Sequence, residues 1–312
     1  MAPSRDLLAR VERLRSLFLD ETRGDRALPD YWRNERDLVA YDAVLGARIG
    51  WKWDAALDEC RERGLPPADG QLVLDHGCGS GIAARRFVRA FGAGRVLCHD
   101  RSRLAATFAA RALQTECGGV AAEAVTRVDD VRPDVLLVSH VLGELDANGE
   151  ETLRALIARS RRVVLVEPGS REVSRRLSAL RDRLAAEFHV VAPCPHRARC
   201  PALAGDTDWC HFFAPPGPEA FTDGDFVRTA RALGIDARAL PYSFVALSKD
   251  PVAAPAPAHR VLGRPRLGRH DAHVQLCTEE GLDDAVVTKR AGAATWRALK
   301  KRPETVRQLP GD

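Results

Sequence analysis

The residues with the clearest chemistry in this 312-residue chain are cysteines in a polar, proline-rich stretch. Cys194, Cys200 and Cys210 are separated by five and nine residues, and Cys277 follows after sixty-six more. Thiols in such a stretch lack the apolar surroundings that usually bury a free cysteine. Four thiolates can close a tetrahedral zinc site or hold a four-iron cluster, so we expect a metal centre on this set.

The spacing of the cysteines bears on which metal they would hold. Structural zinc sites usually contain paired Cys-x2-Cys knuckles, and the sequence has none. Three cysteines in a loop with a remote fourth fit an iron–sulfur cluster held by that loop and a returning strand. His196 and His211 lie in the same loop, so a zinc site with mixed cysteine and histidine ligands is the alternative.

A second candidate site is the glycine-rich segment Asp75-x-Gly77-x-Gly79-x-Gly81, which follows an apolar strand and opens a helix. Glycines let a backbone turn sharply and approach a ligand, and a helix N-terminus offers free amide donors. The dinucleotide fingerprint would need a third glycine where Ile82 stands. The pattern resembles instead motif I of the class I S-adenosylmethionine (SAM) methyltransferases.

This resemblance implies further cofactor-binding positions. Asp75 would reach the methionine part of SAM through water or an amide, and Asp100, at the end of the second strand, would bind the ribose hydroxyls. The Asp129-Asp130 pair precedes the fourth strand, where the family often contacts adenine, and Ser139 ends a strand similar to motif IV. No Asn/Asp-Pro-Pro-aromatic motif follows that strand, so no catalytic residue is assigned.

The elements that must position these residues alternate between strand and helix. Strands are predicted over 71–75, 95–100, 134–139, 162–167 and 242–247, and helices over 82–91, 103–113, 149–159 and 172–188. This order predicts a doubly wound, Rossmann-like α/β sheet with helices on both faces. The capping-box spacing of Thr222 and Asp225 predicts another helix, which ends near Gly234.

Composition shifts divide the chain into three parts. Residues 1–70 are predicted to be a helical N-terminal region, and 71–250 a SAM-methyltransferase-like domain with a cysteine-rich loop over 192–218. The third part, 251–312, begins within a Pro/Ala linker over 250–258 and is predicted to be a small, basic, β-rich appendage. This last part has 11 Lys+Arg and 7 Asp+Glu, and therefore carries the whole net charge of +4.

The surplus charge of the appendage predicts an anionic partner. We expect a stripe of four arginines to contact phosphate groups; it consists of Arg260, Arg264, Arg266 and Arg269. The alternative is a solvated, charged hairpin.

Targeting signals are not evident. Charged residues occupy the N-terminus where a signal peptide needs an apolar stretch, and no apolar run is long enough to span a bilayer. We therefore expect a cytoplasmic protein without a membrane partner, and a monomer.

The cysteine loop carries a more specific resemblance. Cys-Pro-His-x3-Cys-Pro followed by Asp-Trp-Cys-His-Phe, with the segments His140 to Leu145 and Glu167-Pro168-Gly169, is similar to the methyltransferase-like proteins associated with the small ribosomal subunit in mitochondria and bacteria. The resemblance covers about residues 72–290. It implies a four-iron cluster on four cysteines and a role with small-subunit rRNA during assembly; the ligands would be Cys194, Cys200, Cys210 and Cys277.

Three functions are compatible with these patterns. The first is a SAM-dependent, rRNA-binding methyltransferase-like protein that carries the cluster. The second is a non-catalytic ribosome-assembly protein whose cluster is a structural clip or redox sensor. The third is a small-molecule methyltransferase with a zinc-stapled loop. In the first two, a cluster that includes Cys277 would dock the basic appendage onto the core.

Overall fold

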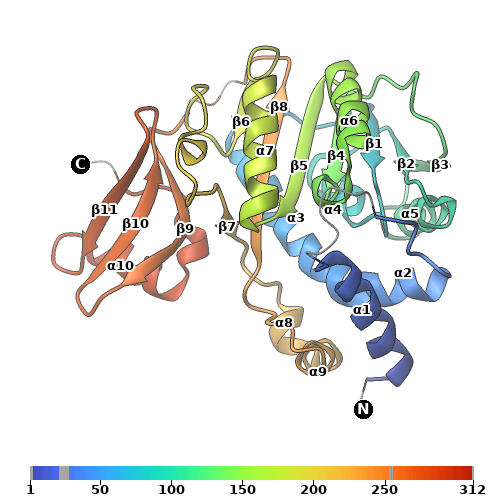
Figure 1. Ribbon diagram of the computed structural model, residues 1–312, viewed down its shortest axis with the longest axis horizontal. Helices are drawn as coiled ribbons and strands as arrows, with labels where there is room; N and C mark the ends of the chain where they lie inside the picture. Colours follow the sequence, from blue (N-terminus) through green and yellow to red (C-terminus); the bar gives the residue numbers. More distant parts are fainter. Residues whose placement is uncertain (1–2, 21–27, 253, 255, 311–312) are drawn as a thin grey trace.

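The computed structural model describes residues 3–20, 28–252, 254 and 256–310. A large central sheet is flanked by helices, and a small second sheet stands at one side of it (Figure 1). Two positions of the predicted linker, Ala253 and Pro255, lie outside the described residues, as do parts of the predicted N-terminal and C-terminal regions. No described helix is long and apolar enough to cross a membrane.

The central sheet has the strand order β3-β2-β1-β4-β5-β8-β6, and β7 pairs with β8. Its strands are β1 (Leu72–His76), β2 (Arg95–His99), β3 (Ala121–Val125), β4 (Val135–Ser139), β5 (Arg162–Pro168), β6 (His189–Ala192), β7 (Phe212–Phe213) and β8 (Pro241–Ser248). Strands β1 to β5 pair in parallel, whereas β8 runs antiparallel to both β5 and β6. The predicted doubly wound fold of the class I SAM methyltransferases is confirmed.

Alternating side chains of the parallel strands build a hydrophobic core on each face of the sheet. Val73, Val96 and Leu137 pack with α3 (Ala47–Glu62), α4 (Ile82–Phe91) and α5 (Arg103–Glu116). Their strand neighbours Leu74, Leu97 and Leu136 pack with α6 (Ala147–Arg159) and α7 (Arg171–Leu184) on the other face. The carboxyl ends of β1, β2 and β4 therefore meet at one edge, where α/β folds bind their ligands.

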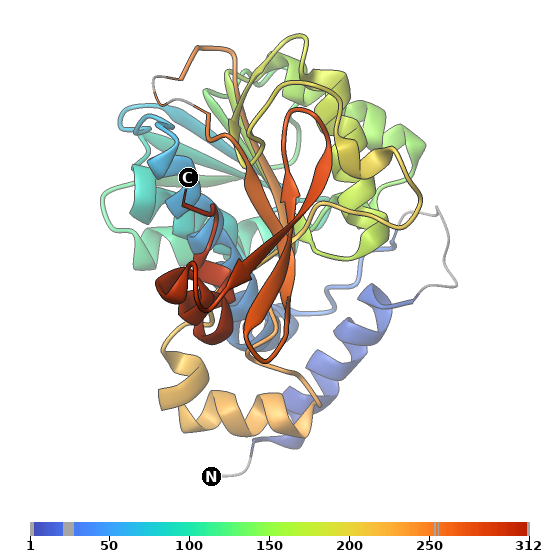
Figure 2. The ribbon, with the colours of Figure 1, turned by 90° about the vertical axis from the view of Figure 1, so that its left-hand side faces the viewer.

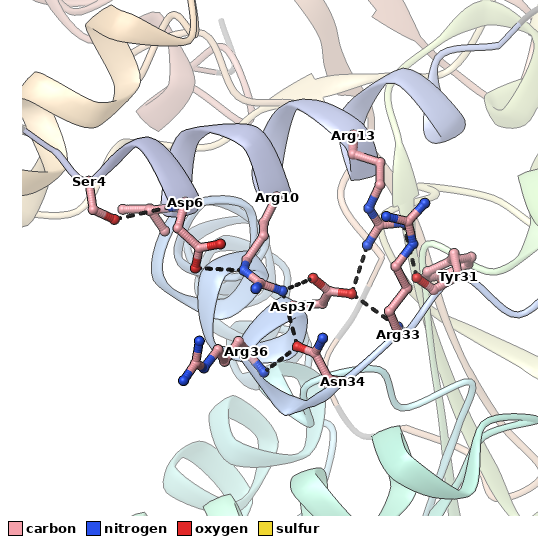
Figure 3. Close-up of polar contacts among 10 residues, drawn as sticks. Ser4, Asp6, Arg10, Arg13, Tyr31, Arg33, Asn34, Arg36 and Asp37 are labelled. Carbon is pink, nitrogen blue, oxygen red and sulfur yellow. Dashed lines mark hydrogen bonds and ion pairs between the residues drawn. The ribbon is translucent and has the colours of Figure 1, made fainter.

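The N-terminal helices are joined through one buried carboxylate. Asp37 of α2 (Glu35–Tyr41) is 1% exposed and accepts from Arg10 at 2.6 Å and Arg13 at 2.8 Å, both on α1 (Arg5–Phe18) (Figure 3). A π-helical turn over Asp42–Gly46 connects α2 to α3. Because a buried carboxylate left without its partners is costly, the Asp37 contacts fix α1 against α2.

The helix predicted after the cysteine loop is two helices, α8 (Glu219–Thr222) and α9 (Gly224–Ala232). The N-cap of α9 is Asp223, whose carboxylate accepts from the backbone N–H of Asp225 at 2.9 Å and of Phe226 at 3.0 Å. The prediction of Thr222 as the cap was wrong, because Thr222 ends α8. Arg15 of α1 donates to the carbonyl of Leu233 at 2.6 Å and holds this region beside α1.

The C-terminal appendage is a three-stranded antiparallel sheet with one helix (Figure 2). It consists of β9 (Arg260–Leu267), β10 (Asp271–Cys277), β11 (Leu282–Thr288) and α10 (Ala293–Lys301). One sheet face, with Val261, Ala272 and Val274, packs on Trp296 and Leu299 of α10. The other face is left to contact the core at one end and solvent at the other.

Direct protein contacts hold the appendage on the core. The N–H of Gly263 donates to the carbonyl of His211 at 2.9 Å, and the Gln275 amide donates to Asp208 at 3.0 Å. The Arg260 guanidinium forms a two-pronged ion pair with Glu59 of α3, with both nitrogen–oxygen distances 2.9 Å. The appendage is therefore anchored independently of any metal.

Candidate cofactor and thiol sites

The glycine loop between β1 and α4 requires glycine at its motif positions. Gly77, Gly79 and Gly81 have φ angles of 71°, 51° and 79°, a region that residues with a β-carbon rarely adopt. A β-carbon at Gly81 would also lie 2.9 Å from that of Ala109 in α5. At Gly79 the nearest atom would be Cζ2 of Trp32, 4.0 Å away. The loop therefore packs tightly on α5 and leaves space at Gly79.

Asp75 lies buried beneath this loop at the end of β1. Its Oδ2 accepts from the backbone N–H of Ala84 at 3.3 Å, whereas its Oδ1 is buried without a hydrogen-bond partner among the described residues. Burial raises the pKa of Asp75 to about 7. An unpaired buried acceptor of this kind can receive a water or an amine of a bound ligand.

Asp100 joins the glycine loop to the end of β2. Its Oδ2 accepts from the N–H of Gly79 at 3.0 Å, and its Oδ1 accepts from the N–H of Ser102 at 2.9 Å. Burial raises the pKa of Asp100, which the two N–H donors oppose. Each carboxylate oxygen keeps lone pairs for a ligand hydroxyl, because it accepts only one of these bonds.

The remaining predicted cofactor residues lie in two different places. Ser139 ends β4 at the same edge, and its Oγ accepts from Nε1 of Trp53 at 2.9 Å. Asp129 and Asp130 lie exposed in the segment between β3 and β4, where Asp129 pairs with Arg127 at 3.1 Å. The structure therefore brings Asp75, Asp100 and Ser139 to the loop edge and leaves the Asp129-Asp130 pair at the surface.

Aromatic residues of the N-terminal region border the loop, although they were not among the predicted site residues. Trp32 lies near Gly79, and Tyr31 donates its hydroxyl to Glu144 at 3.2 Å. The Arg101 guanidinium, next to Asp100, lies 5.3 Å from the centre of the Tyr31 ring. Tyr31 and Trp32 are adjacent in irregular backbone before α2, so helical periodicity could not mark them as site residues.

The four predicted thiols line one pocket between the cysteine loop and the appendage. Cys194, Cys200 and Cys210 come from the loop and Cys277 from β10. The sulfur of Cys277 lies 3.4 Å from Nε2 of His196. Burial raises the pKa values of Cys194, Cys210 and Cys277, the last to about 12, as expected for thiols without a metal.

Helix α7 holds the cysteine loop in shape. Arg175 donates to the carbonyls of Ala202, Gly205 and Asp208 at 2.9, 2.8 and 2.8 Å. The neighbouring Asp182 accepts the backbone N–H of Cys200 with both of its oxygens, at 3.1 and 3.0 Å.

Arg181, also on α7, donates to the carbonyls of His196 and Ala198 and lines the thiol pocket. The loop backbone is therefore positioned by protein contacts alone. A cationic guanidinium beside the sulfurs also favours their anionic form.

The thiol pocket does not have the arrangement of a site for a single metal ion. Within the described ranges, no group of three or more His, Cys, Asp or Glu side chains is arranged to hold one metal ion. The described part of the chain therefore does not support the expected metal centre on these thiols.

The predicted arginine stripe is shorter than expected. Arg260 is 5% exposed, is paired with Glu59, and lies 4.2 Å from the Phe212 ring centre. Its prediction as a phosphate contact was wrong, because its guanidinium is sequestered in the join between core and appendage. Arg264, Arg266 and Arg269 are exposed, although Arg266 also pairs with Asp284 at 3.2 Å.

Solved structures resemble the chain at low identity. Magnesium protoporphyrin IX methyltransferase from Synechocystis PCC 6803, determined with bound SAH, is 14% identical, with 79% of this chain and 95% of that one covered and a TM-score of 0.39. Precorrin-6y C5,15-methyltransferase from Geobacter metallireducens GS-15 is 12% identical, with 62% and 86% covered and a TM-score of 0.38. No curated protein matches the chain.

A family model identifies the chain more specifically. The model described as mitochondrial small ribosomal subunit Rsm22 matches residues 70–303. The match includes the glycine loop, the cysteine loop and the three strands of the appendage. The chain therefore belongs to the Rsm22 family of the mitochondrial small ribosomal subunit.

Proposed function

We propose that this protein is a SAM-dependent, methyltransferase-like factor that binds small-subunit rRNA during ribosome assembly or translation and carries a [4Fe–4S] cluster. The observation that carries the proposal is the single pocket lined by Cys194, Cys200, Cys210 and Cys277. Three of these thiols belong to the core and one to the basic appendage, so a cluster there would join the cofactor domain to the RNA-binding part.

The residues around the pocket favour an anionic group. Arg181 and Arg260 both line it, and a thiolate-ligated cluster carries negative charge that such guanidiniums offset. When bound, the cluster would supply a redox-active crosslink between the loop and β10. Arg181 and Asp182 would orient Cys194 and Cys200 for it, since both residues already fix the loop backbone.

The glycine-loop edge would hold SAM. In this proposal the Gly77–Gly81 backbone approaches the methionine and ribose parts, and Oδ1 of Asp75 receives a water or the amino group. Asp100 accepts from the ribose hydroxyls, and Ser139 borders the methyl donor. Asp129 and Asp130 remain proposed adenine contacts, which their exposed position permits only at the rim of the site.

The solvent-exposed end of the appendage would bind rRNA. Arg264 and Arg266 are both exposed on β9, and Arg266 lies opposite His273 of β10. The Arg264 guanidinium also lies 4.2 Å from the Phe213 ring centre, which fixes its direction. With Arg269 at the adjoining turn, three cations face outward on the segment that carries the net charge.

Binding to purified small subunits or their rRNA tests this function. The triple variant Arg264→Gln, Arg266→Gln, Arg269→Gln should bind more weakly, and each lost phosphate contact should reduce the slope of log K against log salt by roughly 0.7–0.9. Arg154→Gln on α6 is the matched control, because Arg154 is also partly exposed and paired within its helix. Equal binding by the triple variant and the wild type would refute the proposed surface.

A non-catalytic assembly factor is the second candidate. The missing Asn/Asp-Pro-Pro-aromatic motif after β4 favours it. Transfer of a labelled methyl group from SAM to small-subunit rRNA would exclude this candidate, whereas SAM binding without transfer would support it.

A further inference from the structure

Three ionisable side chains gather at the carboxyl ends of β4 and β5, and none of them has been given a role so far. The Lys52 amine of α3 lies 3.3 Å from Nε2 of His140, the residue after β4. Glu167 of β5 accepts with Oε1 from the N–H groups of Val141 and Leu142, at 3.0 and 3.2 Å. The carboxylate and the amine therefore approach the same turn.

The backbone of this turn is strained at His140. Its φ of 57° is the one positive φ among the described non-glycine residues, and its N–H donates to the carbonyl of Val166 at 3.0 Å. A left-handed histidine is strained, and such strained residues cluster at functional sites. Nδ1 of His140 and Oε2 of Glu167 are both buried without a hydrogen-bond partner in the described part of the chain.

Two basic nitrogens 3.3 Å apart cannot both be protonated to their positively charged forms at low cost. Burial, reinforced by the charge of Arg48, lowers the pKa of Lys52 to about 7, and burial also lowers the pKa of His140. The amine can then donate one N–H to Nε2 of neutral His140 and keep its lone pair free. The charged groups acting on the Lys52–Glu167 pair are Arg48 of α3, Glu144 after β4 and Arg176 of α7.

The amine lies at the same sheet edge as the glycine loop. β1, which leads into the loop, pairs with β4, which leads into His140. A β-carbon on Gly77 would lie only 2.5 Å from Cγ2 of Val141, so the two turns are in contact. Trp53, the residue after Lys52, donates to Ser139 at 2.9 Å and fixes α3 over the end of β4.

We propose that Lys52 is the general base of a methyl-acceptor site and that His140 is its positioning residue. This inference rests on the proposed SAM binding. The acceptor would be an N–H or O–H nucleophile of small-subunit rRNA, because such a group must lose a proton when it is methylated.

In the proposed step, the acceptor nitrogen or oxygen forms a bond to the methyl carbon while the carbon–sulfur bond of SAM breaks. The bonding pair stays on sulfur, which leaves as the neutral thioether of S-adenosylhomocysteine. The acceptor proton passes to Nζ of Lys52, which becomes an ammonium and takes up the positive charge lost by the sulfonium. His140 keeps Nζ oriented through Nε2 and stays neutral.

The test uses the full chain, methyl-labelled SAM and small-subunit rRNA. Wild-type transfer should rise with pH to a plateau, with a midpoint near pH 7. Lys52→Arg should lose about 100-fold or more of the rate, because a guanidinium stays protonated. Lys249→Arg, on a lysine remote from the site that donates to the carbonyl of Ala158, should keep the rate.

The Arg48→Gln variant distinguishes a general base from a residue with a structural role only, because a structural role of Lys52 would leave the midpoint of the pH profile unchanged. Because the Arg48 charge lowers the pKa of Lys52, its removal should shift the midpoint of the pH profile to higher pH. His140→Asn, which tolerates a positive φ, should retain the fold and lose most of the rate.

SAM affinity is measured for each variant to establish that the cofactor site is intact. If the Lys52→Arg variant transfers methyl groups as fast as the wild-type protein, the acceptor-site proposal alone is overturned. The same holds if the wild-type protein binds SAM but methylates no small-subunit rRNA. A wild type that fails to bind SAM would overturn the proposed function as well.

Discussion

The sulfur of Cys277 on β10 lies 3.4 Å from Nε2 of His196 in the cysteine loop, across 81 residues of sequence. This contact connects the appendage to the core at the thiol pocket. It is one of several such connections, because Glu59 and Arg260 form a buried ion pair in the same join. The thiols and the ion pair are therefore separate connections between the appendage and the core, and each can be removed by mutation without the other.

We predict that Cys277→Ser removes the proposed metal centre and leaves the appendage docked. Glu59→Gln should keep the proposed metal centre and loosen the end of the appendage next to the linker, because it leaves the Arg260 guanidinium buried without its carboxylate, at a cost of about 3–5 kcal/mol. Iron content measures the first effect, and limited proteolysis in the linker over 250–258 measures the second. Rapid linker cleavage in Cys277→Ser would contradict this separation.

The Arg175 side chain should be required for the shape of the cysteine loop. It donates to three loop carbonyls, so Arg175→Leu should expose the segment 201–208 to proteases and reduce metal retention. Arg183→Gln is the control on the same helix, since Arg183 is 59% exposed and pairs only at 3.5 Å with Glu150. Equal protease sensitivity in both variants would show that α7 does not template the loop.

The contribution of Asp75 to the stability of the ligand-free protein should fall as the pH rises from about 4 to about 7. Unfolded Asp75 loses its proton near its usual pKa of 3.8, whereas burial holds the folded pKa at about 7. The folded state is therefore penalised increasingly over this interval, and the penalty is complete above it.

Asp75→Asn should remove that part of the pH dependence, stabilise the ligand-free protein by about 1–3 kcal/mol at pH 7.5 or above, and weaken SAM binding. Glu167, whose pKa is raised to about 8, acts in the same direction and keeps some slope. Denaturant unfolding at several pH values measures both. An unchanged pH slope in Asp75→Asn would refute the assignment of this penalty to Asp75.

Gly81→Ala should damage the cofactor loop more than Gly119→Ala damages its own turn. Both glycines have positive φ, but an added β-carbon at Gly81 meets Ala109 at 2.9 Å, whereas none of the atoms around Gly119 is within 4 Å. We expect Gly81→Ala to cost about 1–3 kcal/mol beyond the backbone penalty that both share. Thermal unfolding with and without SAM compares the two, and equal losses would contradict the packing argument.

The parallel core could be predicted from sequence because its strands are strongly apolar and its helices strongly periodic. The helix predicted over 82–91 matches α4, and the glycine loop marked its start. β3 was not predicted, because Ala121–Val125 is an alanine-rich edge strand with exposed residues and only one β-branched side chain. β6 was missed because it has four residues and follows α7 after a short turn.

The candidate sites were partly predictable for a physical reason. Residues tied to local motifs, such as Asp75 and the three glycines, lie where the motif places them, because the strand–loop–helix unit is local. The burial of Arg260 and the approach of Lys52 to His140 depend on α3, which is distant in sequence from both Arg260 and His140. Pairings of this kind leave no periodic signal in one sequence.

Iron and acid-labile sulfide in anaerobically purified protein test the central claim most directly. A [4Fe–4S] cluster on Cys194, Cys200, Cys210 and Cys277 predicts about four irons and about four sulfides per chain. Both should be lost in Cys277→Ser and retained in Cys117→Ser, which changes a cysteine that does not line the thiol pocket. Stoichiometric zinc without iron or sulfide would contradict the account.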